Sequence, residues 1–374
     1  MSEKLAEARA ALRARRFAQA MFLLLECRDD GVAEAYSEIG QLYRHGNGIV
    51  QSHDEAVRWY RMGVESDDVR SICLLGSMYR DANGVEQDYG EALRHFRDAA
   101  DRGDPWAMTN LGGLYLNVQG VSQDHAQAMH WYRRGAELGD STAISSIGHL
   151  YEDGLGIGAD GQQALHWYNK ALTDGDRSGM ALTCFRLGRL YARGVGVERS
   201  YETAMRWYLQ SAELGYAAAM NNIGIMYEYG QGVTKDMGEA YRRYRMAADL
   251  GYAVAENNVG RMHEGGDGIP QDDGEAERWY RKAAEHGDGA AMVNLGRAYH
   301  DGRGVGRDYA EAYRWYEKGV AKGNTWAMNN IGLLCQHGLG RPADAAEAMR
   351  WYARSAELGN EEAGKNLRNL RAER

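Results

Sequence analysis

Glycines at a fixed spacing constrain this chain more than any other feature. Within its 374 residues, one glycine recurs at the equivalent position of nine consecutive segments: Gly40, Gly76, Gly112, Gly148, Gly188, Gly224, Gly260, Gly296 and Gly332. Each step is 36 residues long, except the step from Gly148 to Gly188, which is 40. A fixed period of this length indicates a repeat architecture, in which each repeat buries its apolar face against its neighbours. We therefore expect one elongated array instead of separate globular domains.

Each repeat contains two apolar patterns with helical spacing. In the segment from Gly289 to Asn324, the first pattern consists of Ala291, Met292, Leu295, Ala298 and Tyr299, and the second of Ala312, Trp315, Tyr316, Gly319 and Val320. Apolar residues three and four apart are typical of amphipathic helices. We call the two predicted helices of each repeat the A helix and the B helix. The loop between them carries a glycine in all nine repeats, which suggests positive φ or close backbone approach.

The start of every B helix carries a capping pattern. We predict N-cap residues at Ser52, Asp88, Asp124, Asp160, Ser200, Asp236, Asp272, Asp308 and Asp344. In eight of the nine repeats a Glu or Gln stands three residues later, as in a capping box, where it would bond back to the N–H of the cap residue. Because the pair recurs at each helix start without a companion nucleophile, we interpret these carboxylates as structural and not catalytic. A Trp-Tyr pair in most B helices is likewise more typical of a core than of a binding platform.

The ends and one junction of the array depart from the regular repeat. We predict an N-terminal helical cap at 1–32, nine repeats at 33–360 and a C-terminal capping helix at 361–374. The four extra residues lie near Asp176 to Phe185. They are expected to lengthen an A helix or bulge its entry, and so to divide the array into an irregular N-terminal half and a regular C-terminal half. A neutral insertion in a surface turn is the alternative.

Composition excludes several classes of function. The formal charge of -9, without basic clusters, argues against nucleic-acid binding driven by phosphate contacts. No apolar run is long enough to span a membrane, and the first residues lack the apolar core of a signal peptide, so a cytoplasmic protein is expected. The four cysteines are too far apart for a metal or redox motif, and we expect reduced, packed thiols at Cys27, Cys73, Cys184 and Cys335. No metal or cofactor is predicted.

The repeat resembles a known family. Its pattern, A-x-x-N-L-G-x-x-Y-x-x-G-x-G-V-x-x-D-x-x-x-A-x-x-W-Y-x-x-A-A-x-x-G, is similar to the Sel-one-like repeat, a relative of the tetratricopeptide repeat, over about Ala33 to Asn360. The resemblance implies an all-α fold, a right-handed α/α superhelical solenoid whose A helices line a concave groove. It also implies an adaptor in protein complexes. Cysteine-rich relatives linked to β-lactam binding have two cysteines per repeat, which this chain lacks.

Asparagines occupy the position that points into the groove in tetratricopeptide relatives, two residues before the column glycine. From the sixth repeat on, this position forms an unbroken row: Asn222, Asn258, Asn294, Asn330 and Asn366. One residue earlier, the row is doubled by Asn221, Asn257 and Asn329. A side-chain amide both donates and accepts, so such a row could bind the backbone of an extended peptide. Alternatively, these asparagines tie neighbouring A helices together or cap loop carbonyls.

Four further residues complete the candidate binding set. Trp106 and Trp326 stand outside the B-helix aromatic stripe, on the same predicted side as the asparagines, where they fit either an interface hot spot or packing at a helix end. Arg261 and Arg297 follow the column glycine and alternate with Glu228 and Glu264. They could contact a mixed-charge peptide or form surface ion pairs of little energetic consequence.

The sequence favours a non-enzymatic adaptor that binds a protein or peptide partner in the groove. The alternative is an inhibitor or immunity-type protein that wraps a globular effector or toxin. A hydrolase would need a repeat-breaking cluster of titratable residues, and none is visible in the sequence. Partner identity and oligomeric state stay open at this point.

Overall fold

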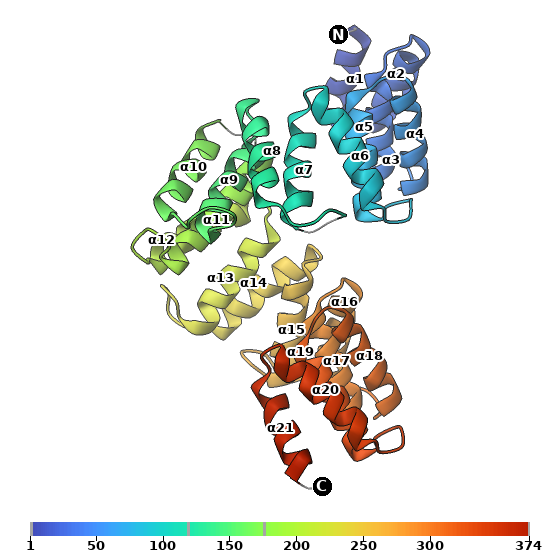
Figure 1. The fold of residues 1–374 in the computed structure, drawn as a ribbon. Coiled ribbons are helices and arrows are strands. Elements are labelled where there is room, and N and C mark those ends of the chain that lie inside the picture. The colour runs from blue at the N-terminus through green and yellow to red at the C-terminus, as the bar shows by residue number, and fades with distance from the viewer. Residues whose placement is uncertain (1–2, 118–119, 175–176, 373–374) are drawn as a thin grey trace. The chain divides into compact units, whose positions relative to one another are not determined.

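The computed structural model describes residues 3–117, 120–174 and 177–372, and within them it is entirely helical, with 21 α-helices (Figure 1). The predicted all-α solenoid of paired helices is confirmed. The chain divides into two compact units, Met1–Glu198 (unit 1) and Arg199–Arg374 (unit 2). The division falls inside the fifth repeat, so its A helix belongs to unit 1 and its B helix to unit 2.

The A helices follow the predicted pattern. Their bounds are α3 (Glu34–His45), α5 (Val69–Asp81), α7 (Pro105–Leu116), α9 (Ser141–Asp153), α11 (Arg177–Arg193), α13 (Ala217–Tyr229), α15 (Ala253–Gly265), α17 (Gly289–Asp301), α19 (Thr325–His337) and α21 (Glu361–Ala372). The helix expected at the C-terminal end is therefore present as α21. The four extra residues lengthen α11, which has 17 residues where most helices of the array have 13.

The B helices alternate with the A helices along the chain. Their bounds are α4 (His53–Glu65), α6 (Tyr89–Asp101), α8 (His125–Glu137), α10 (Gly161–Asp174), α12 (Tyr201–Glu213), α14 (Met237–Asp249), α16 (Asp273–Glu285), α18 (Tyr309–Ala321) and α20 (Ala345–Glu357). Two further helices, α1 (Glu3–Arg13) and α2 (Phe17–Asp29), precede the first repeat as predicted. Figure 1 shows the helices of each unit stacked as antiparallel pairs.

The core of most pairs forms where the column glycine of the A helix meets a buried tyrosine of the B helix, and Gly76 meets the ring of Phe96 instead. A Cβ atom on Gly296 would lie 2.5 Å from Cε1 of Tyr316, which is 2% exposed. The tryptophans before these tyrosines are buried or half-buried, so the interpretation of the aromatic stripe as core is confirmed. The four cysteines are buried free thiols, as expected.

Both predicted reasons for the loop glycine are present. Gly304 has φ +69, and a Cβ atom there would collide with the carbonyl oxygen of Asp273, the first residue of the preceding B helix. The loop therefore packs directly on the helix of the repeat before it, and the backbone conformation favours glycine as well. These contacts fix the spacing between successive repeats.

The predicted N-caps of the B helices are confirmed. The other predicted bond of the capping box, from the Glu or Gln side chain back to the N–H of the cap residue, is wrong. Asp236 accepts from the N–H of Glu239 at 2.9 Å, and the other eight predicted cap residues accept in the same way. However, the N–H of Asp236 donates to the carbonyl oxygen of Tyr227 on the A helix at 3.0 Å. Glu239 is therefore not needed by the cap, and it binds Arg242 at 2.7 Å instead.

Candidate functional site

The asparagine row lies on one face of the A helices of unit 2. Asn222 is on α13, Asn258 on α15, Asn294 on α17, Asn330 on α19 and Asn366 on α21, and all five are half-buried. Each occupies the same turn of its helix, because the row has the period of the repeat. We call this surface the asparagine face.

The doubled positions tie neighbouring A helices together. Nδ2 of Asn258 donates to Oδ1 of Asn221 at 2.9 Å, and Asn294 donates to Asn257 at 2.8 Å. Nδ2 of Asn366 donates in the same way to Oδ1 of Asn329 at 2.9 Å. These pairs therefore form the inter-helix ties that were one of the two interpretations of the sequence. The tie uses one N–H of each donor amide, and a carboxamide has a second N–H and a carbonyl oxygen for other partners. Binding of a peptide stays a prediction.

Asn330 interrupts this arrangement. The residue one repeat before Asn329 is Val293, which cannot accept a hydrogen bond, so Asn330 has no amide partner on α17. It lies instead against the buried hydroxyl of Tyr316. Burial and the nearby Asp301 raise the pKa of Tyr316 well above its usual value, so this hydroxyl stays protonated.

A hollow opens beside Asn330. It has a volume of about 200 Å³, and its walls are Arg297, His300, Asp301, Tyr316, Asn330 and Leu333. We call it the Leu333 hollow. Sequence reasoning missed Leu333 and His300 as site residues. The sequence did contain a sign of this hollow. Val293 replaces the asparagine of the regular pattern, His300 replaces the glutamate and Leu333 replaces the arginine.

The two tryptophans outside the aromatic stripe are solvent-exposed. Trp326 is 55% exposed at the start of α19, one helical turn from Asn330, and therefore shares the asparagine face. Trp106 is 38% exposed on α7 in unit 1, where its carbonyl oxygen accepts from Nδ2 of Asn110 at 2.8 Å. The structure thus puts Trp326, but not Trp106, in the same unit as the asparagine row.

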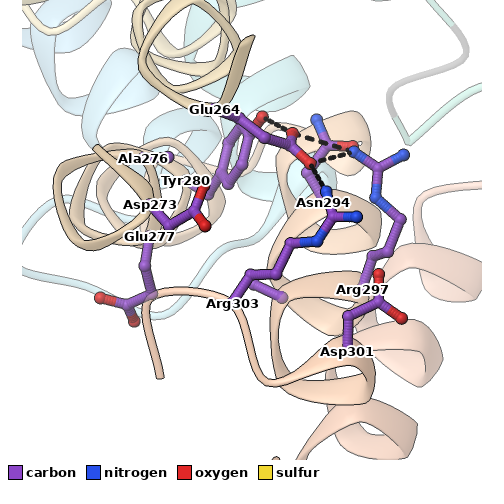
Figure 2. A pocket seen from close by; sticks show the side chains of 10 residues that line it. Glu264, Asp273, Ala276, Glu277, Tyr280, Asn294, Arg297, Asp301 and Arg303 are labelled. Carbon is purple, nitrogen blue, oxygen red and sulfur yellow. Dashed lines mark hydrogen bonds and ion pairs between the residues drawn. The ribbon is translucent and has the colours of Figure 1, made fainter. Parts of the chain in front are cut away.

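The predicted arginines pair with glutamates on the preceding A helix. Arg297 donates to both oxygens of Glu264 at 3.0 Å, and Tyr280 donates to the same carboxylate at 2.6 Å (Figure 2). Arg261 binds Glu228 in the same way at 2.7 Å. Glu228 is buried, so this is more than a surface ion pair. Although burial raises the pKa of Glu228, its bonds with Arg261 and Tyr244 leave it below the usual value.

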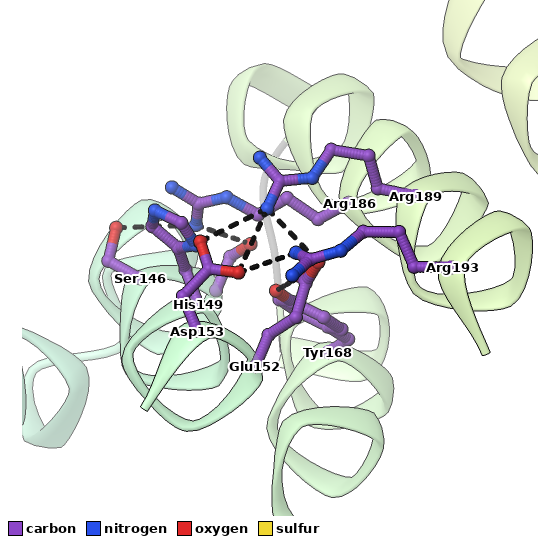
Figure 3. A network of polar contacts seen from close by, with 9 residues as sticks. Ser146, His149, Glu152, Asp153, Tyr168, Arg186, Arg189 and Arg193 are labelled. Carbon is purple, nitrogen blue, oxygen red and sulfur yellow. Dashed lines mark hydrogen bonds and ion pairs between the residues drawn. The ribbon is translucent and has the colours of Figure 1, made fainter. Parts of the chain in front are cut away.

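A cluster of titratable residues in unit 1 was missed by the sequence reasoning. Arg189 and Arg193 of the lengthened helix α11 bind the fully buried Glu152 at 3.0 and 2.9 Å, and Tyr168 donates to it at 2.6 Å (Figure 3). Arg189 and Arg193 also bind Asp153. The sequence feature that could have indicated this cluster is the spacing of Arg189 and Arg193, which are four residues apart and so lie on one face of α11.

This cluster is built for cohesion and not for acid–base chemistry. Burial and the nearby Arg186 lower the pKa of His149 to about 4, so this imidazole is neutral at pH 7. The carboxylates beside it are engaged by arginines, and the hydroxyl of Tyr168 is buried. The cluster joins α9, α10 and α11 at the place where the four extra residues disturb the repeat.

The part of the chain that the structure describes contains no group of three or more His, Cys, Asp or Glu side chains that could hold a metal ion. None of the described helices is long and apolar enough to cross a membrane.

Comparisons with known proteins agree with this architecture. The model of the Sel1 repeat matches nine segments: 33–68, 69–104, 107–140, 141–176, 181–216, 217–252, 253–288, 289–324 and 327–360. The chain is 27% identical to the structure of a protective antigen of uropathogenic Escherichia coli, with 99% of this chain and 80% of that chain covered and a TM-score of 0.58. A Sel1 repeat protein from Oxalobacter formigenes is 31% identical over 84% of this chain and 90% of its own, with a TM-score of 0.51. No curated protein sequence matches the chain.

Tandem helix pairs joined by repeated contacts define a solenoid protein of the α/α class. The matched segments cover most of the chain, and the chain belongs to the Sel1 repeat family. The resemblance predicted from the glycine, asparagine and Trp-Tyr positions is therefore confirmed. Sel1 repeat proteins generally mediate protein–protein interaction and are typically non-catalytic scaffolds.

Proposed function

We propose that this protein is a non-enzymatic, cytoplasmic adaptor that binds an extended segment of a protein partner on the asparagine face of unit 2. The observation that carries the proposal is the orientation of the inter-helix ties. Asn258, Asn294 and Asn366 each donate one N–H to an asparagine of the preceding A helix. Each of these half-buried amides has a second N–H and a carbonyl oxygen that can bind a partner.

The spacing of the row suits an extended backbone. Helices packed against each other lie about 8–10 Å apart, and an extended chain rises about 3.3 Å per residue, so about three residues of a partner would span one step. Each step then offers one donor and one acceptor to main-chain groups. Recognition of this kind tolerates many sequences, because every residue except proline carries the same main-chain groups.

The absence of catalysis is part of the proposal. The cluster around Glu152 is the strongest alternative site for chemistry, but its carboxylates are held by Arg189 and Arg193. A general base needs a free carboxylate or imidazole within reach of a substrate proton. His149 has a half-buried ring that lies 3.3 Å from Asp153, and its pKa, lowered to about 4, makes it a weak base.

The proposal is tested by removing the amides of the row while preserving the fold. The variant Asn258→Ala/Asn294→Ala/Asn330→Ala should lose proteins that the wild-type chain enriches in affinity purification followed by mass spectrometry. Each lost amide removes one or two hydrogen bonds, worth about 0.5–1.5 kcal/mol each, so the triple variant should bind at least about tenfold more weakly.

A matched control separates binding from the loss of the ties. Asn221→Ala/Asn257→Ala removes the acceptors of the same two ties but leaves the amides of Asn258 and Asn294 in place, and it should retain the partner. If the triple variant binds as well as the wild type, the asparagine face is not the binding surface. If the control loses the partner as completely as the triple variant, the asparagines act only through the fold.

A further inference from the structure

The contact between α17 and α19 differs from the contact between α15 and α17, one repeat earlier. In the earlier contact, Arg297 extends across the surface to Glu264, and the cavity left there is only about 10 Å³ (Figure 2). One repeat later, Leu333 replaces the arginine and His300 replaces the glutamate, and the Leu333 hollow of about 200 Å³ remains. A leucine is too short to reach across as the guanidinium does. Two substitutions in the regular pattern therefore open the hollow.

The charged groups around the hollow are paired within the protein. Arg297 binds Glu264 at 3.0 Å, and Nδ1 of His300 lies 2.7 Å from Oδ1 of Asp301. An ionic occupant would therefore compete with existing pairs. The remaining lining, Leu333 and the ring of Tyr316, favours an apolar occupant.

A polar and an aromatic side chain lie beside the hollow on the same face of α19. Trp326, Asn330 and Leu333 lie at positions i, i+4 and i+7 of α19, so they share one face of the helix. Among Asn258, Asn294, Asn330 and Asn366, Asn330 is the one without an amide partner on the preceding A helix, and Trp326 is 55% exposed. Interface hot spots are enriched in tryptophan and lie in well-packed pockets from which the surrounding contacts exclude water, and the hollow beside Trp326 offers such a pocket.

We propose that the Leu333 hollow is the anchor pocket of the asparagine face, and that it takes one uncharged aliphatic side chain of about leucine size from an extended partner segment. The inference rests on the proposed function, because the segment reaches the hollow along the asparagine row. Asn330 bonds the main chain beside the anchor, and Trp326 packs on the flanking residue. The row then supplies general affinity, and the hollow sets which residue is preferred.

The test uses a random peptide library displayed on phage and selected on the full-length protein. The selected peptides should share one aliphatic residue with uncharged neighbours. Their affinities are then measured by isothermal titration calorimetry on the wild type and on His300→Glu/Leu333→Arg, which restores the regular pair of the preceding contact. Because the neighbouring contact has this pair and folds, the variant should keep its melting temperature. Peptide binding should fall about tenfold or more, which is the loss expected when a leucine side chain is denied burial.

Two comparisons make the result specific. Leu358→Arg makes the same leucine-to-arginine change at an exposed helix end, where Leu358 is 58% exposed, and should leave peptide binding unchanged. Replacing the aliphatic residue of the peptide by aspartate or lysine should weaken binding to the wild type but have little effect on the already weak binding to the double variant. The anchor pocket is refuted by equal binding to the wild type and the double variant, or by a selection that yields no aliphatic consensus. Peptides that need Asn258 and Asn294 but ignore Leu333 would refute the anchor pocket and leave the proposed function standing.

Discussion

Two neighbouring glycines in α7, Gly112 and Gly113, show how strongly packing limits the residue type at a single position. A Cβ atom on Gly112 would lie 2.5 Å from Cε1 of Tyr132, which is 4% exposed and has no room to move aside. A Cβ atom on Gly113 would find Oη of Tyr132 as its nearest atom, at 3.9 Å, which is ordinary contact. The two positions share one helix and one type of residue, and only their neighbours differ.

We predict opposite effects of alanine at these two positions. Alanine is favoured over glycine inside a helix by about 1 kcal/mol. At Gly113 this gain stands alone, so Gly113→Ala should stabilise the protein by up to about 1 kcal/mol. At Gly112 overpacking costs about 1–3 kcal/mol and outweighs the gain, so Gly112→Ala should destabilise it. Urea denaturation of both variants checks the signs, and stabilisation by Gly112→Ala would contradict the assigned contact.

At the scale of helices, one buried carboxylate joins three of them. Glu228 at the end of α13 accepts from Tyr244 of α14 at 2.6 Å and pairs with Arg261 of α15 at 2.7 Å. Three repeats later, Gln336 takes the equivalent place and accepts from Tyr352 at 2.7 Å. A neutral amide therefore fits this position and keeps the bond from the tyrosine. The charge of Glu228 serves the bond with Arg261.

The variant Glu228→Gln should consequently show a pH-dependent loss of stability. The pKa of Glu228 lies below its ordinary value of 4.5, so its charge stabilises the folded state above that pH, and this contribution is lost as the pH falls through the lowered pKa. At pH 7 the variant should be less stable by about 1 kcal/mol, since Arg261 is partly exposed and water weakens the pair. The gap in urea midpoint between wild type and variant should close below pH 4.5. A gap that is independent of pH would show that the effect is packing and not charge.

The sequence predicted local structure well and contacts between repeats less well. Helix positions, caps and glycine conformations follow from short-range patterns, and the caps at Asp236 and its equivalents were found in this way. The role of Glu239 was mistaken because the N–H of Asp236 is taken by Tyr227, on another helix. The Leu333 hollow was missed because His300 and Leu333 are each ordinary residues, and they line a cavity only where two A helices meet.

At the scale of the whole molecule, stability is expected to be a sum over neighbouring repeats. Each helix contacts mainly the helices before and after it, and several A helices, such as α13 and α15, also contact the next A helix. In such arrays a local change alters the repeat that carries it and the repeats it touches, and its influence declines with distance along the chain. The ties through Asn258 and Asn294 and the arginine pairs of unit 2 all follow this nearest-neighbour rule.

We therefore predict that Gly112→Ala raises hydrogen exchange only locally. Exchange is measured by mass spectrometry under native conditions, and it should accelerate in α5 to α9. The substitution disrupts the packing of α7 on α8 at Gly112 and Tyr132, and this destabilises the helices that contact them. The amides of α15 to α20 in unit 2 should exchange as in the wild type, and Gly113→Ala should accelerate exchange in neither unit. If Gly112→Ala raised exchange equally in α17 and α7, the chain would unfold as a single cooperative body, and the asparagine face could not be altered independently of unit 1.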